Sequence, residues 1–448
     1  MTTEETPSGS QRGSSTRQAG PFDAIGVGIG PFNLSLAALL APTSFHARFF
    51  ERNAEFQWHP GLLFPESTIQ VSYLKDLVTL ADPTSRYSFL AFLHAKKRFY
   101  RFINTGQARV HRLEFNQYLQ WVAGQLDNVE FGAEVKMVSL EADHFSVRLS
   151  DRTLSTTNLV LGTGLVPNIP PWARPYLGRE LFHSIDYLDH PFDVTGKLVA
   201  VVGGGQSGAE VVFHLLRDNE RLPMQLMWIS SRGNFLPLDD SPFTNELFTP
   251  AYSDYFFGLS REQRDLLLGE QRLASDGVSE ALLQRIYNRL YELEFFERRD
   301  QASDGGGQSA NRLARLIPGQ EVVDLRPGAP GCELVLRSRW GDPQTVRADI
   351  VVLATGFAYD LPEAMRPLSD RLSWDRDGFV VRADFSIVWD GPANLQIYAQ
   401  DAARHMRGVA DPNLSLMAWR SAMIANSLLG KTAYEVEGES SALDFQET

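Results

Sequence analysis

Cysteine is nearly absent from this chain, since Cys332 is the only one in 448 residues. A single thiol excludes an internal disulfide, a CxxC redox pair and a thiolate-rich metal site, and it is typical of a reducing compartment. The nine histidines show no HExxH or similar ligand spacing. No apolar run approaches the ~18 residues that a membrane span needs. We therefore expect a cytoplasmic protein with no metal site and no membrane span.

An excess of positive charge is also missing. The chain has 42 Lys and Arg against 55 Asp and Glu, a formal net charge of −13. That balance argues against a nucleic-acid partner, which would require a basic face. The first 20 residues are polar and contain no hydrophobic segment, so we expect a disordered tail and no signal peptide. The length suits two or three domains.

The first pattern with chemical content is a glycine turn between an apolar strand and a helix. "FDAIGVGIG" predicts the strand, "PFNLSLAALLA" the helix and "HARFFER" a second strand that ends in an acid. Gly26, Gly28 and Gly30 allow a backbone approach to a pyrophosphate at the helix N-terminus, where Pro31 is tolerated. Glu51 stands where a carboxylate accepts bonds from a ribose diol. The alternative is an ordinary turn with a solvent-facing glutamate.

The same order of elements recurs in "GKLVAVVGGG", "QSGAEVVFHLLRD" and "MQLMWISSR". The loop residues expected to contact a second dinucleotide are Gly203, Gly205, Gln206, Ser207 and Gly208. No acid ends the following strand; Ser230, Ser231 and Arg232 stand there instead. Serines and an arginine suit the 2′-phosphate of NADPH, which an acid would repel. The alternative is that Arg232 is a solvated surface charge.

These two units predict an α/β protein with two Rossmann-like dinucleotide-binding domains, one inserted in the other, and a smaller, mostly helical substrate region. "TTNLVLGTGLVPNIP" and "ADIVVLATGFAYDLP" are expected to return the chain to the first domain, with Thr355 and Gly356 at the cofactor. The expected layout is a tail at 1–20, an FAD domain at 21–190, an NADPH domain at 191–345 with the helical region at about 241–300, a return to the FAD domain with a substrate-closing segment at 346–432, and a C-terminal tail at 433–448.

An acid after the first loop and an arginine after the second indicate two different dinucleotides, FAD and NADPH. A protein that holds both is built to move a hydride from nicotinamide to flavin. Disulfide reduction is excluded because one cysteine cannot form a redox pair. Dioxygen is then the expected electron acceptor.

Several longer blocks resemble one known family. They are "GVGIGPFNLSLAALL", "FQWHPGLLFPESTIQVSYLKDLVTLADPTSRYSFL", "VVGGGQSGAE", "LATGF" and "DPNLSLMAWRSA". Between residues 22 and 432 the chain resembles the flavin-dependent N-hydroxylating monooxygenases of siderophore biosynthesis, in the branch of lysine N6-hydroxylases and diamine N-hydroxylases. The resemblance implies hydroxylation of a terminal primary amine with FAD, NADPH and O2, ahead of acylation to an iron-chelating hydroxamate. It also implies a homo-oligomer, a dimer or tetramer.

The resemblance also assigns residues beyond the loops. Trp58 and His59 would lie beside the flavin, and Gln70 near its isoalloxazine edge. The remaining residues, expected at the substrate or the cofactors, are Lys75, Asn245, Leu414 and Ser415. Gln70 and Asn245 would position the reactants, and no residue is expected to act as a strong acid or base. Without the resemblance, Lys75 would be taken as a solvated lysine.

The sequence narrows the choice of substrate but does not decide between L-lysine and a diamine. Ornithine-using members carry a second asparagine in a context like "NYS", where this chain has "LASDGVSEALLQRIYNRLYE", which argues against ornithine. A lysine carboxylate would suit Lys75, whereas the far ammonium of putrescine or cadaverine would require an acid. Asp401 and Asp411 are candidates for that acid by charge alone, although turn or capping roles are commoner.

Two other classes remain open. A flavin monooxygenase that oxidises sulfides or ketones often shows "FxGxxxHxxxW/Y", and "LFHSIDYLDHPFDVTG" matches it in part through Phe182, His183 and Tyr187. A non-catalytic flavin-binding protein is the third possibility, which the intact second glycine loop and Arg232 disfavour.

Overall fold

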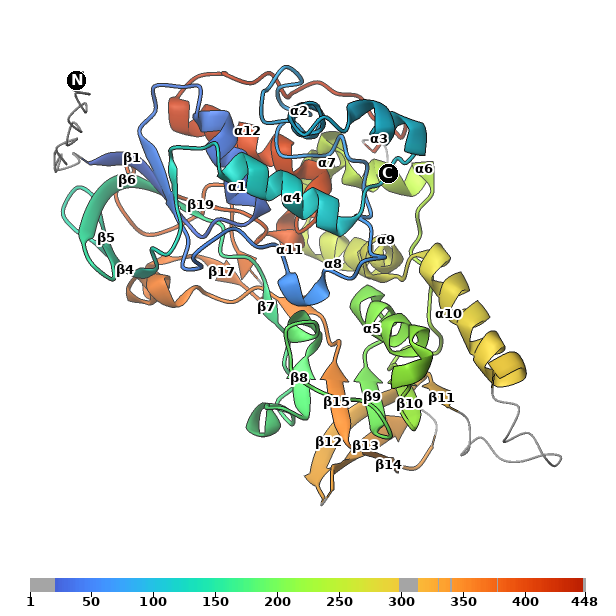
Figure 1. The fold of residues 1–448 in the computed structure, drawn as a ribbon. Helices are drawn as coiled ribbons and strands as arrows, with labels where there is room; N and C mark the ends of the chain where they lie inside the picture. The colour runs from blue at the N-terminus through green and yellow to red at the C-terminus, as the bar shows by residue number, and fades with distance from the viewer. Residues whose placement is uncertain (1–20, 298–312, 329, 339–340, 377, 446–448) are drawn as a thin grey trace, which may run out of the picture.

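The computed structural model describes residues 21–297, 313–328, 330–338, 341–376 and 378–445. The tail expected at 1–20 lies outside the described residues, as does the end of the expected C-terminal tail at 446–448. Two sheets, each covered by helices, occupy separate halves of the molecule, so the predicted α/β class is confirmed (Figure 1).

The first sheet contains the first glycine turn. Its strand order is β3-β2-β1-β6-β5-β4, and β19 also pairs with β6. Strands β3, β2, β1, β6 and β19 run parallel to one another. At the other edge, β5 pairs antiparallel with both β6 and β4. The bounds are β1 Phe22–Val27, β2 Ala47–Phe50, β3 Val129–Glu130, β4 Val135–Leu140, β5 Phe145–Leu149, β6 Thr153–Leu161 and β19 Gln396–Ala399.

Helix α1 (Pro31–Leu40) is the best-buried helix of this half, since each of its residues is buried. It begins directly after Gly30, and Pro31 takes the first helical position, where its missing N–H costs nothing. Its apolar sequence explains the burial against α12, which joins the fold from the far end of the chain. The other helices of this half are α2 Phe89–Ala95, α3 Phe99–Thr105, α4 Arg112–Ala123, α11 Arg404–Arg407 and α12 Met417–Leu429.

The second sheet is wholly parallel, with the strand order β11-β10-β9-β15-β8. Its central strands, β9 and β15, are continuous apolar runs, as expected of parallel strands that are covered on both faces. The bounds are β8 Leu181–His183, β9 Leu198–Val202, β10 Gln225–Ile229, β11 Ala314–Ile317 and β15 Ile350–Leu353. Helix α5 (Gln206–Arg217) lies on one face, and an antiparallel sheet of β12 Gln320–Pro327, β13 Cys332–Ser338 and β14 Gln344–Ala348 packs on the other.

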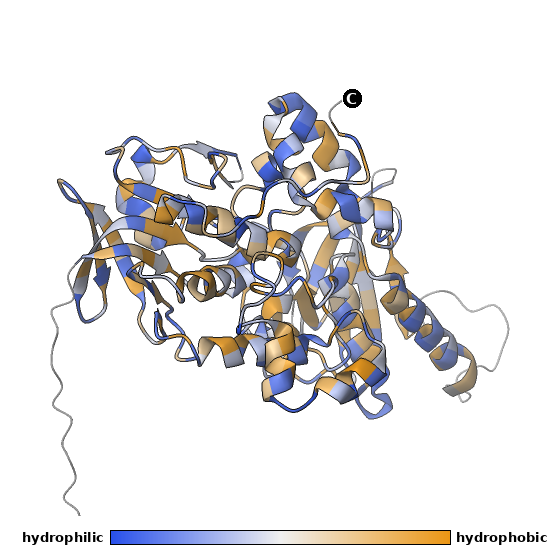
Figure 2. Cartoon of the chain, turned by 90° about the horizontal axis from the view of Figure 1, so that it is seen from above, coloured by the Kyte–Doolittle hydropathy of each residue, from blue (hydrophilic) through white to orange (hydrophobic). Residues whose placement is uncertain are grey.

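The region expected to be helical at about 241–300 is helical in its described part. It comprises α6 Pro242–Asn245, α7 Pro250–Gly258, α8 Arg261–Glu270, α9 Arg272–Asp276 and α10 Glu280–Glu292. Helix α10 packs against α5 and projects from the body of the molecule, and hydrophobic and hydrophilic residues alternate along it (Figure 2).

Two short strands carry the chain between the halves. β7 (Val166–Pro167) pairs antiparallel with β16 (Phe357–Ala358). β8 precedes the domain boundary expected at 190 and β15 follows the one expected at 345. Both strands nevertheless belong to the second sheet, so that sheet extends beyond the expected boundaries on both sides. The second apolar strand, "ADIVVL", was expected to return to the first sheet. An apolar strand of this kind suits the interior of either sheet, so the sequence could not reveal its hydrogen-bonding partner.

Two searches of the described residues bear on membrane and metal binding. None of the helices described is long and apolar enough to cross a membrane. Within the same residues, no group of three or more His, Cys, Asp or Glu side chains is arranged to hold a metal ion.

Candidate active site

The first glycine turn has the geometry that a pyrophosphate requires. A Cβ on Gly26 would lie 2.0 Å from the ring of Phe49, and Gly28 has φ +84° with its Cβ position 2.6 Å from the Gly162 carbonyl oxygen. Gly30, in contrast, faces space where the nearest atom to an added Cβ is 4.0 Å away. Two glycines are thus required by packing, and the third leaves the N-terminus of α1 open to an anion.

Glu51 lies beside this turn, as the sequence predicts for a ribose-binding acid. Its Oε2 accepts a hydrogen bond of 2.9 Å from the Ile29 N–H, and its Oε1 accepts one of 3.0 Å from the Asn53 N–H. The carboxylate is half-buried, so it remains accessible from the turn. The residues of the first loop therefore fit an FAD adenosine and pyrophosphate.

The second loop repeats this arrangement on β9 and α5. Gly203 has φ +135°, and its Cβ would lie 2.0 Å from the Ala354 carbonyl oxygen. The Cβ of a residue at 208 would lie 2.2 Å from the Gly203 carbonyl oxygen, so Gly208 permits the close approach of helix and strand. Nothing lies within 4 Å of an added Cβ on Gly205, which precedes the first turn of α5. These residues fit the pyrophosphate of a second dinucleotide.

Gln206 and Ser207 follow at the start of α5 but differ in their surroundings. Gln206 accepts a hydrogen bond from the Ser279 N–H (2.9 Å) and donates to Glu210 (2.8 Å), so it joins α5 to the start of α10. Ser207 lines the central cavity described below. Of the two, Ser207 is the one that faces open space.

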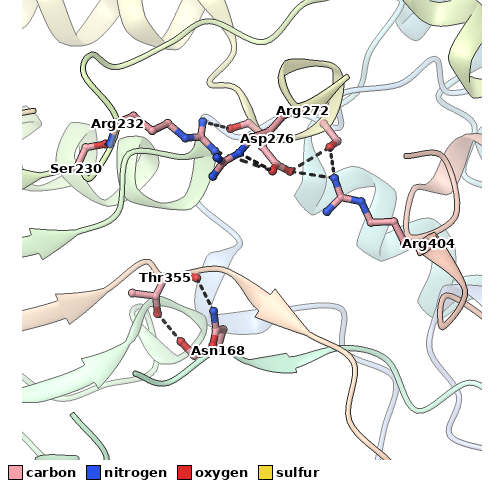
Figure 3. Close-up of polar contacts among 8 residues, drawn as sticks. Asn168, Ser230, Arg232, Arg272, Asp276, Thr355 and Arg404 are labelled. Carbon is pink, nitrogen blue, oxygen red and sulfur yellow. Dashed lines mark hydrogen bonds and ion pairs between the residues drawn. The ribbon is translucent and has the colours of Figure 1, made fainter. Parts of the chain in front are cut away.

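Arg232 does not extend freely into solvent. Its Nη1 donates to the Asp276 carbonyl oxygen at 2.7 Å, and its side chain is 17% exposed. Arg272 and Arg404 contact the same aspartate (Figure 3). Burial, and then the neighbouring Arg272, lower the pKa of Arg232. The alternative of a solvated surface charge therefore does not describe its position.

Thr355 and Gly356 lie at the crossing between the halves. The Thr355 hydroxyl donates to the Asn168 carbonyl oxygen at 2.6 Å, which joins the two crossing segments (Figure 3). Gly356 has φ +82°, and an added Cβ would meet nothing within 4 Å. Their neighbour Phe357 reaches the central cavity.

A cavity of about 240 Å³ is lined by residues of both halves, among them Ser207 at the start of α5. It brings together residues that the sequence places far apart, namely Trp58, His59, Gln70, Ser207 and Leu414. Apolar walls are added by Leu62, Leu63, Ile69, Val71, Phe357 and Pro412, and polar ones by Arg112 and Asn413. Gln70 Nε2 is buried and has no hydrogen-bond partner within the described residues. A buried donor of this kind requires an acceptor, and the heteroatoms of an isoalloxazine ring supply one.

His59 is held in the left-handed region, with φ +49°. Its side chain is solvent-exposed where it lines the cavity, although the surrounding protein atoms partly desolvate the ring. This desolvation, and then the charge of Arg112, lower the pKa of His59 to about 4. The imidazole is therefore neutral near pH 7, and it lies near Trp58, with ring centroids 5.7 Å apart.

Sequence reasoning missed a pair of charges at the cavity wall. Arg112 Nη1 on α4 lies 2.9 Å from Glu210 Oε2 on α5, and the side chains are 18% and 5% exposed. The one available signal was a glutamate on the otherwise apolar buried face of the α5 sequence. Nothing in the local sequence indicates its partner.

The expected substrate residues are more scattered. Lys75 is half-buried, and no carboxylate among the described residues forms an ion pair with it; burial lowers the pKa of Lys75. Asn245 is exposed and donates to Asp240 Oδ1 at 3.3 Å. Ser415 is buried next to Leu414, and only Leu414 of the two lines the cavity. Lys75 and Asn245 also lie outside the lining of this cavity.

The two aspartates considered for a diamine ammonium are elsewhere. Asp411 Oδ1 lies 2.8 Å from Arg420, and both side chains are 1% exposed. Asp401 is buried, and that burial raises the pKa of Asp401 to about 7. Neither lines the cavity, and within the described part of the chain no other Asp or Glu does so.

The partial fingerprint of sulfide and ketone oxidising enzymes is core packing. Phe182, His183 and Tyr187 are all buried in the second half, and none lines the cavity. His183 Nδ1 accepts from the Ile185 N–H, and the Tyr187 hydroxyl bonds to His214.

Two dinucleotide folds that both contribute residues to one cavity define a two-domain flavin and nicotinamide oxidoreductase. Within that class, residues 20–359 match the family of L-lysine 6-monooxygenase and L-ornithine 5-monooxygenase, and the chain belongs to it. It is 36% identical to the L-lysine N6-monooxygenase of Escherichia coli over 419 residues, covering 92% of this chain and 96% of the relative.

Solved structures agree with this assignment. The cadaverine monooxygenase of the desferrioxamine pathway from Erwinia amylovora, bound to FAD, has a TM-score of 0.86 at 31% identity, covering 95% of this chain and 98% of that one. The ornithine N-hydroxylase of Kutzneria sp. 744, solved with reduced FAD, NADP+ and L-ornithine, has a TM-score of 0.83 at 30% identity, covering 92% and 99%.

Proposed function

We propose that this protein is an FAD- and NADPH-dependent monooxygenase that hydroxylates the terminal primary amine of L-lysine or of an aliphatic diamine such as cadaverine or putrescine. The product would serve hydroxamate siderophore biosynthesis. The observation that carries the proposal is the cavity where Trp58, His59 and Gln70 of the first half meet Ser207 of the second. Membership of a family of amine N-hydroxylases supports the reaction class.

The chain's own residues contribute position and desolvation. Bound FAD would supply oxygen transfer and NADPH the hydride. Gly30 and Glu51 would hold the FAD pyrophosphate and ribose, and Gly205 with Arg232 would hold NADPH. Leu62, Ile69, Leu414 and their apolar neighbours exclude water from the cavity, which suppresses side reactions. Gln70 would donate an N–H to the flavin edge, and the neutral His59 would add no positive charge beside it.

The cavity also favours the form of the amine that can react. Nitrogen must carry a lone pair to take up oxygen, so the ammonium has to lose its proton first. No carboxylate of the described chain lines the cavity, and Glu210 pairs with the one arginine that does. An ammonium would thus be desolvated without a counter-charge, which lowers its pKa and favours the neutral amine. Binding therefore performs part of the deprotonation without a catalytic base.

Lys75 is proposed as the residue that distinguishes the two substrate classes. Its half-buried ammonium has no carboxylate partner among the described residues, so a lysine carboxylate would complete an ion pair there. Asn245, held by Asp240, would contact the substrate and the nicotinamide ribose, and Ser415 would support the closing segment. With a diamine as substrate, Lys75 would contact the cofactor only, and the far ammonium of the diamine would require another partner.

The test is hydroxylamine formation in air with FAD and NADPH, across L-lysine, L-ornithine, cadaverine, putrescine and a tube without amine. Lys75→Met is assayed beside the wild type, because methionine keeps the length of the chain and removes the charge. If Lys75 binds a carboxylate, the variant raises KM for L-lysine and leaves the diamines unchanged. NADPH consumption that yields only peroxide with every amine would contradict the proposed function.

Two further expectations concern the whole molecule. The family resemblance supports a homo-oligomer, a dimer or tetramer, which light scattering after size-exclusion chromatography measures directly. A cytoplasmic location is supported by the single cysteine, Cys332, and fractionation of cells tests it.

A further inference from the structure

The chain after α12 turns back and is anchored on the first half. Asn426, in the last turn of α12, accepts hydrogen bonds from the Ala433 and Tyr434 N–H groups at 2.8 and 2.9 Å and donates to the Tyr434 carbonyl oxygen at 2.8 Å. The Tyr434 hydroxyl donates to the Leu39 carbonyl oxygen on α1, and Val436 is buried in the same apolar core as α1. The start of the segment expected to be a tail is therefore fixed to the FAD half.

The far end of this segment reaches the helical region. Ser441 Oγ donates to Glu246 Oε2 at 2.5 Å, and the Ala442 N–H donates to the same oxygen at 3.3 Å. The Phe445 ring packs against two tyrosines of α7, with ring centroids 5.0 and 5.5 Å apart. Residues 434–445, which we call the strap, thus join the core of the first half to the beginning of the helical region.

The residue that the strap holds directly follows Asn245, which is the expected substrate contact. Helix α6 has four residues and none of them is buried, so it has little stability of its own. Contacts from outside the helix therefore decide where the exposed Asn245 side chain lies. After the helix these contacts are the hydrogen bonds from the strap to Glu246 and the burial of Phe248.

A contact from the first half holds the other side of α6. Arg109 Nη2 lies 2.5 Å from Asp240 Oδ2, and Asp240 Oδ1 accepts the hydrogen bond from Asn245. The residue before Arg109 accepts a backbone hydrogen bond of 3.2 Å from the Tyr73 N–H, two residues before Lys75. The segments that carry Lys75 and Asn245 are therefore tied to one stretch of chain, and the strap completes the attachment of the second.

We propose that the strap fixes α6 against the first half, and that Ser441 and Phe445 are positioning residues for the amine substrate. This rests on the proposed function, in which Asn245 contacts the amine and the nicotinamide ribose. Ser441 acts through Glu246, and Phe445 acts through α7. Without them, α6 would shift relative to the cavity, and a displacement of about 1 Å is enough to impair a reaction that depends on orientation.

Steady-state kinetics of the FAD-loaded, full-length protein test the role of Ser441, with L-lysine, cadaverine and putrescine as amines. Ser441→Ala should raise the KM for the amine up to about tenfold, which corresponds to one hydrogen bond to a charged group, and should lower the yield of hydroxylamine per NADPH. Ser441→Thr keeps the hydroxyl group and should restore the wild-type KM. Ser440→Ala, a change at the exposed neighbouring serine, is the matched control.

Two further comparisons separate positioning from a general loss of stability. Phe445→Ala should raise the same KM, whereas Phe445→Tyr keeps the ring and should not. If Ser441 acts through Glu246, the double variant Ser441→Ala, Glu246→Ala has a KM no higher than that of Glu246→Ala alone. A lower melting temperature with an unchanged KM, or an equal rise of KM in Ser440→Ala, would overturn the proposal.

Hydrogen exchange of the FAD-loaded protein without amine gives a readout that needs no turnover. Amides of residues 241–258 should exchange faster in Ser441→Ala and Phe445→Ala than in the wild type or Ser440→Ala. Unchanged exchange there would show that the strap does not hold α6 and α7, whatever the kinetics. If the wild type hydroxylates none of the amines, the proposed function is contradicted, and the exchange rates still decide whether the strap fixes this region.

Discussion

Arg112 of the first half and Glu210 of the second form an ion pair of 2.9 Å at the wall of the cavity. Glu210 also accepts from Gln206, which in turn accepts from the Ser279 N–H at the start of α10. A single carboxylate therefore connects α4, α5 and the helical region around the place where flavin and nicotinamide would meet. The pair is one of the contacts that join the two halves.

Glu210→Gln should lower the free energy of unfolding by about 1–3 kcal/mol, because it leaves the Arg112 guanidinium without its counter-charge in a poorly solvated position. Thermal and denaturant unfolding of the FAD-loaded protein measure the change. Glu321→Gln, which removes the exposed partner of Arg337, is the matched control and should change stability by about 0.5 kcal/mol or less. Equal effects of the two variants would show that the pair between the halves contributes nothing.

The glycines of the second loop should separate folding from cofactor binding. Gly203→Ala places a Cβ 2.0 Å from the Ala354 carbonyl oxygen at φ +135°, so it should reduce stability by several kcal/mol. Gly205→Ala meets nothing within 4 Å and should cost about 1 kcal/mol or less, yet its methyl group occupies the space of a phosphate. Unfolding curves and NADPH calorimetry are the two measurements. Normal NADPH binding by Gly205→Ala would count against a phosphate at this turn.

Stability should fall as the solution is acidified from about pH 6.5 toward pH 4, in part because of His183. Its imidazole is 3% exposed, and burial lowers the pKa of His183 to about 4. The unfolded chain binds the proton near pH 6.5 while the folded one does not, so protonation favours unfolding throughout that window. The full shift corresponds to about 3 kcal/mol.

The check is the free energy of unfolding at pH 7 and pH 5. His183→Gln should show a smaller difference between the two pH values than the wild type, because glutamine does not titrate. His144→Gln, which changes a histidine on the surface beside Asp143, should keep the wild-type difference. A wild-type slope in His183→Gln would assign the pH dependence to other groups.

The yield of hydroxylamine per NADPH oxidised should rise with pH between about 7 and 9. The reacting amine must be neutral, and its ordinary pKa near 10.4 makes it a minor species at pH 7. Desolvation in the cavity should place the limb of the profile near or below the free pKa of the amine. Rapid assays that measure hydroxylamine and NADPH together give this ratio, and a flat profile would contradict deprotonation in the cavity.

The sequence alone determined the local structure and the class of reaction. Gly28 and Gly203 need their backbone angles whatever surrounds them, and strand, turn and helix follow one another within a few residues. Glu51 was expected at the ribose because the end of a neighbouring parallel strand lies beside the turn. The block around Trp58, His59 and Gln70 identified the family, and these residues do line the cavity.

Only the tertiary structure decided which distant segments meet. β15 could have joined either sheet, since an apolar strand does not specify its hydrogen-bonding partner, and it pairs with β9 and β8. Asp401 and Asp411 were equal candidates by charge, and the structure buries both in positions that do not line the cavity. Arg112 with Glu210, and Asp276 with its three arginines, join residues that only the packing of the two halves brings together. Electrostatic contacts and burial depend on distances in space, and these residues are far apart in the sequence. Their contacts therefore follow from the folded structure alone.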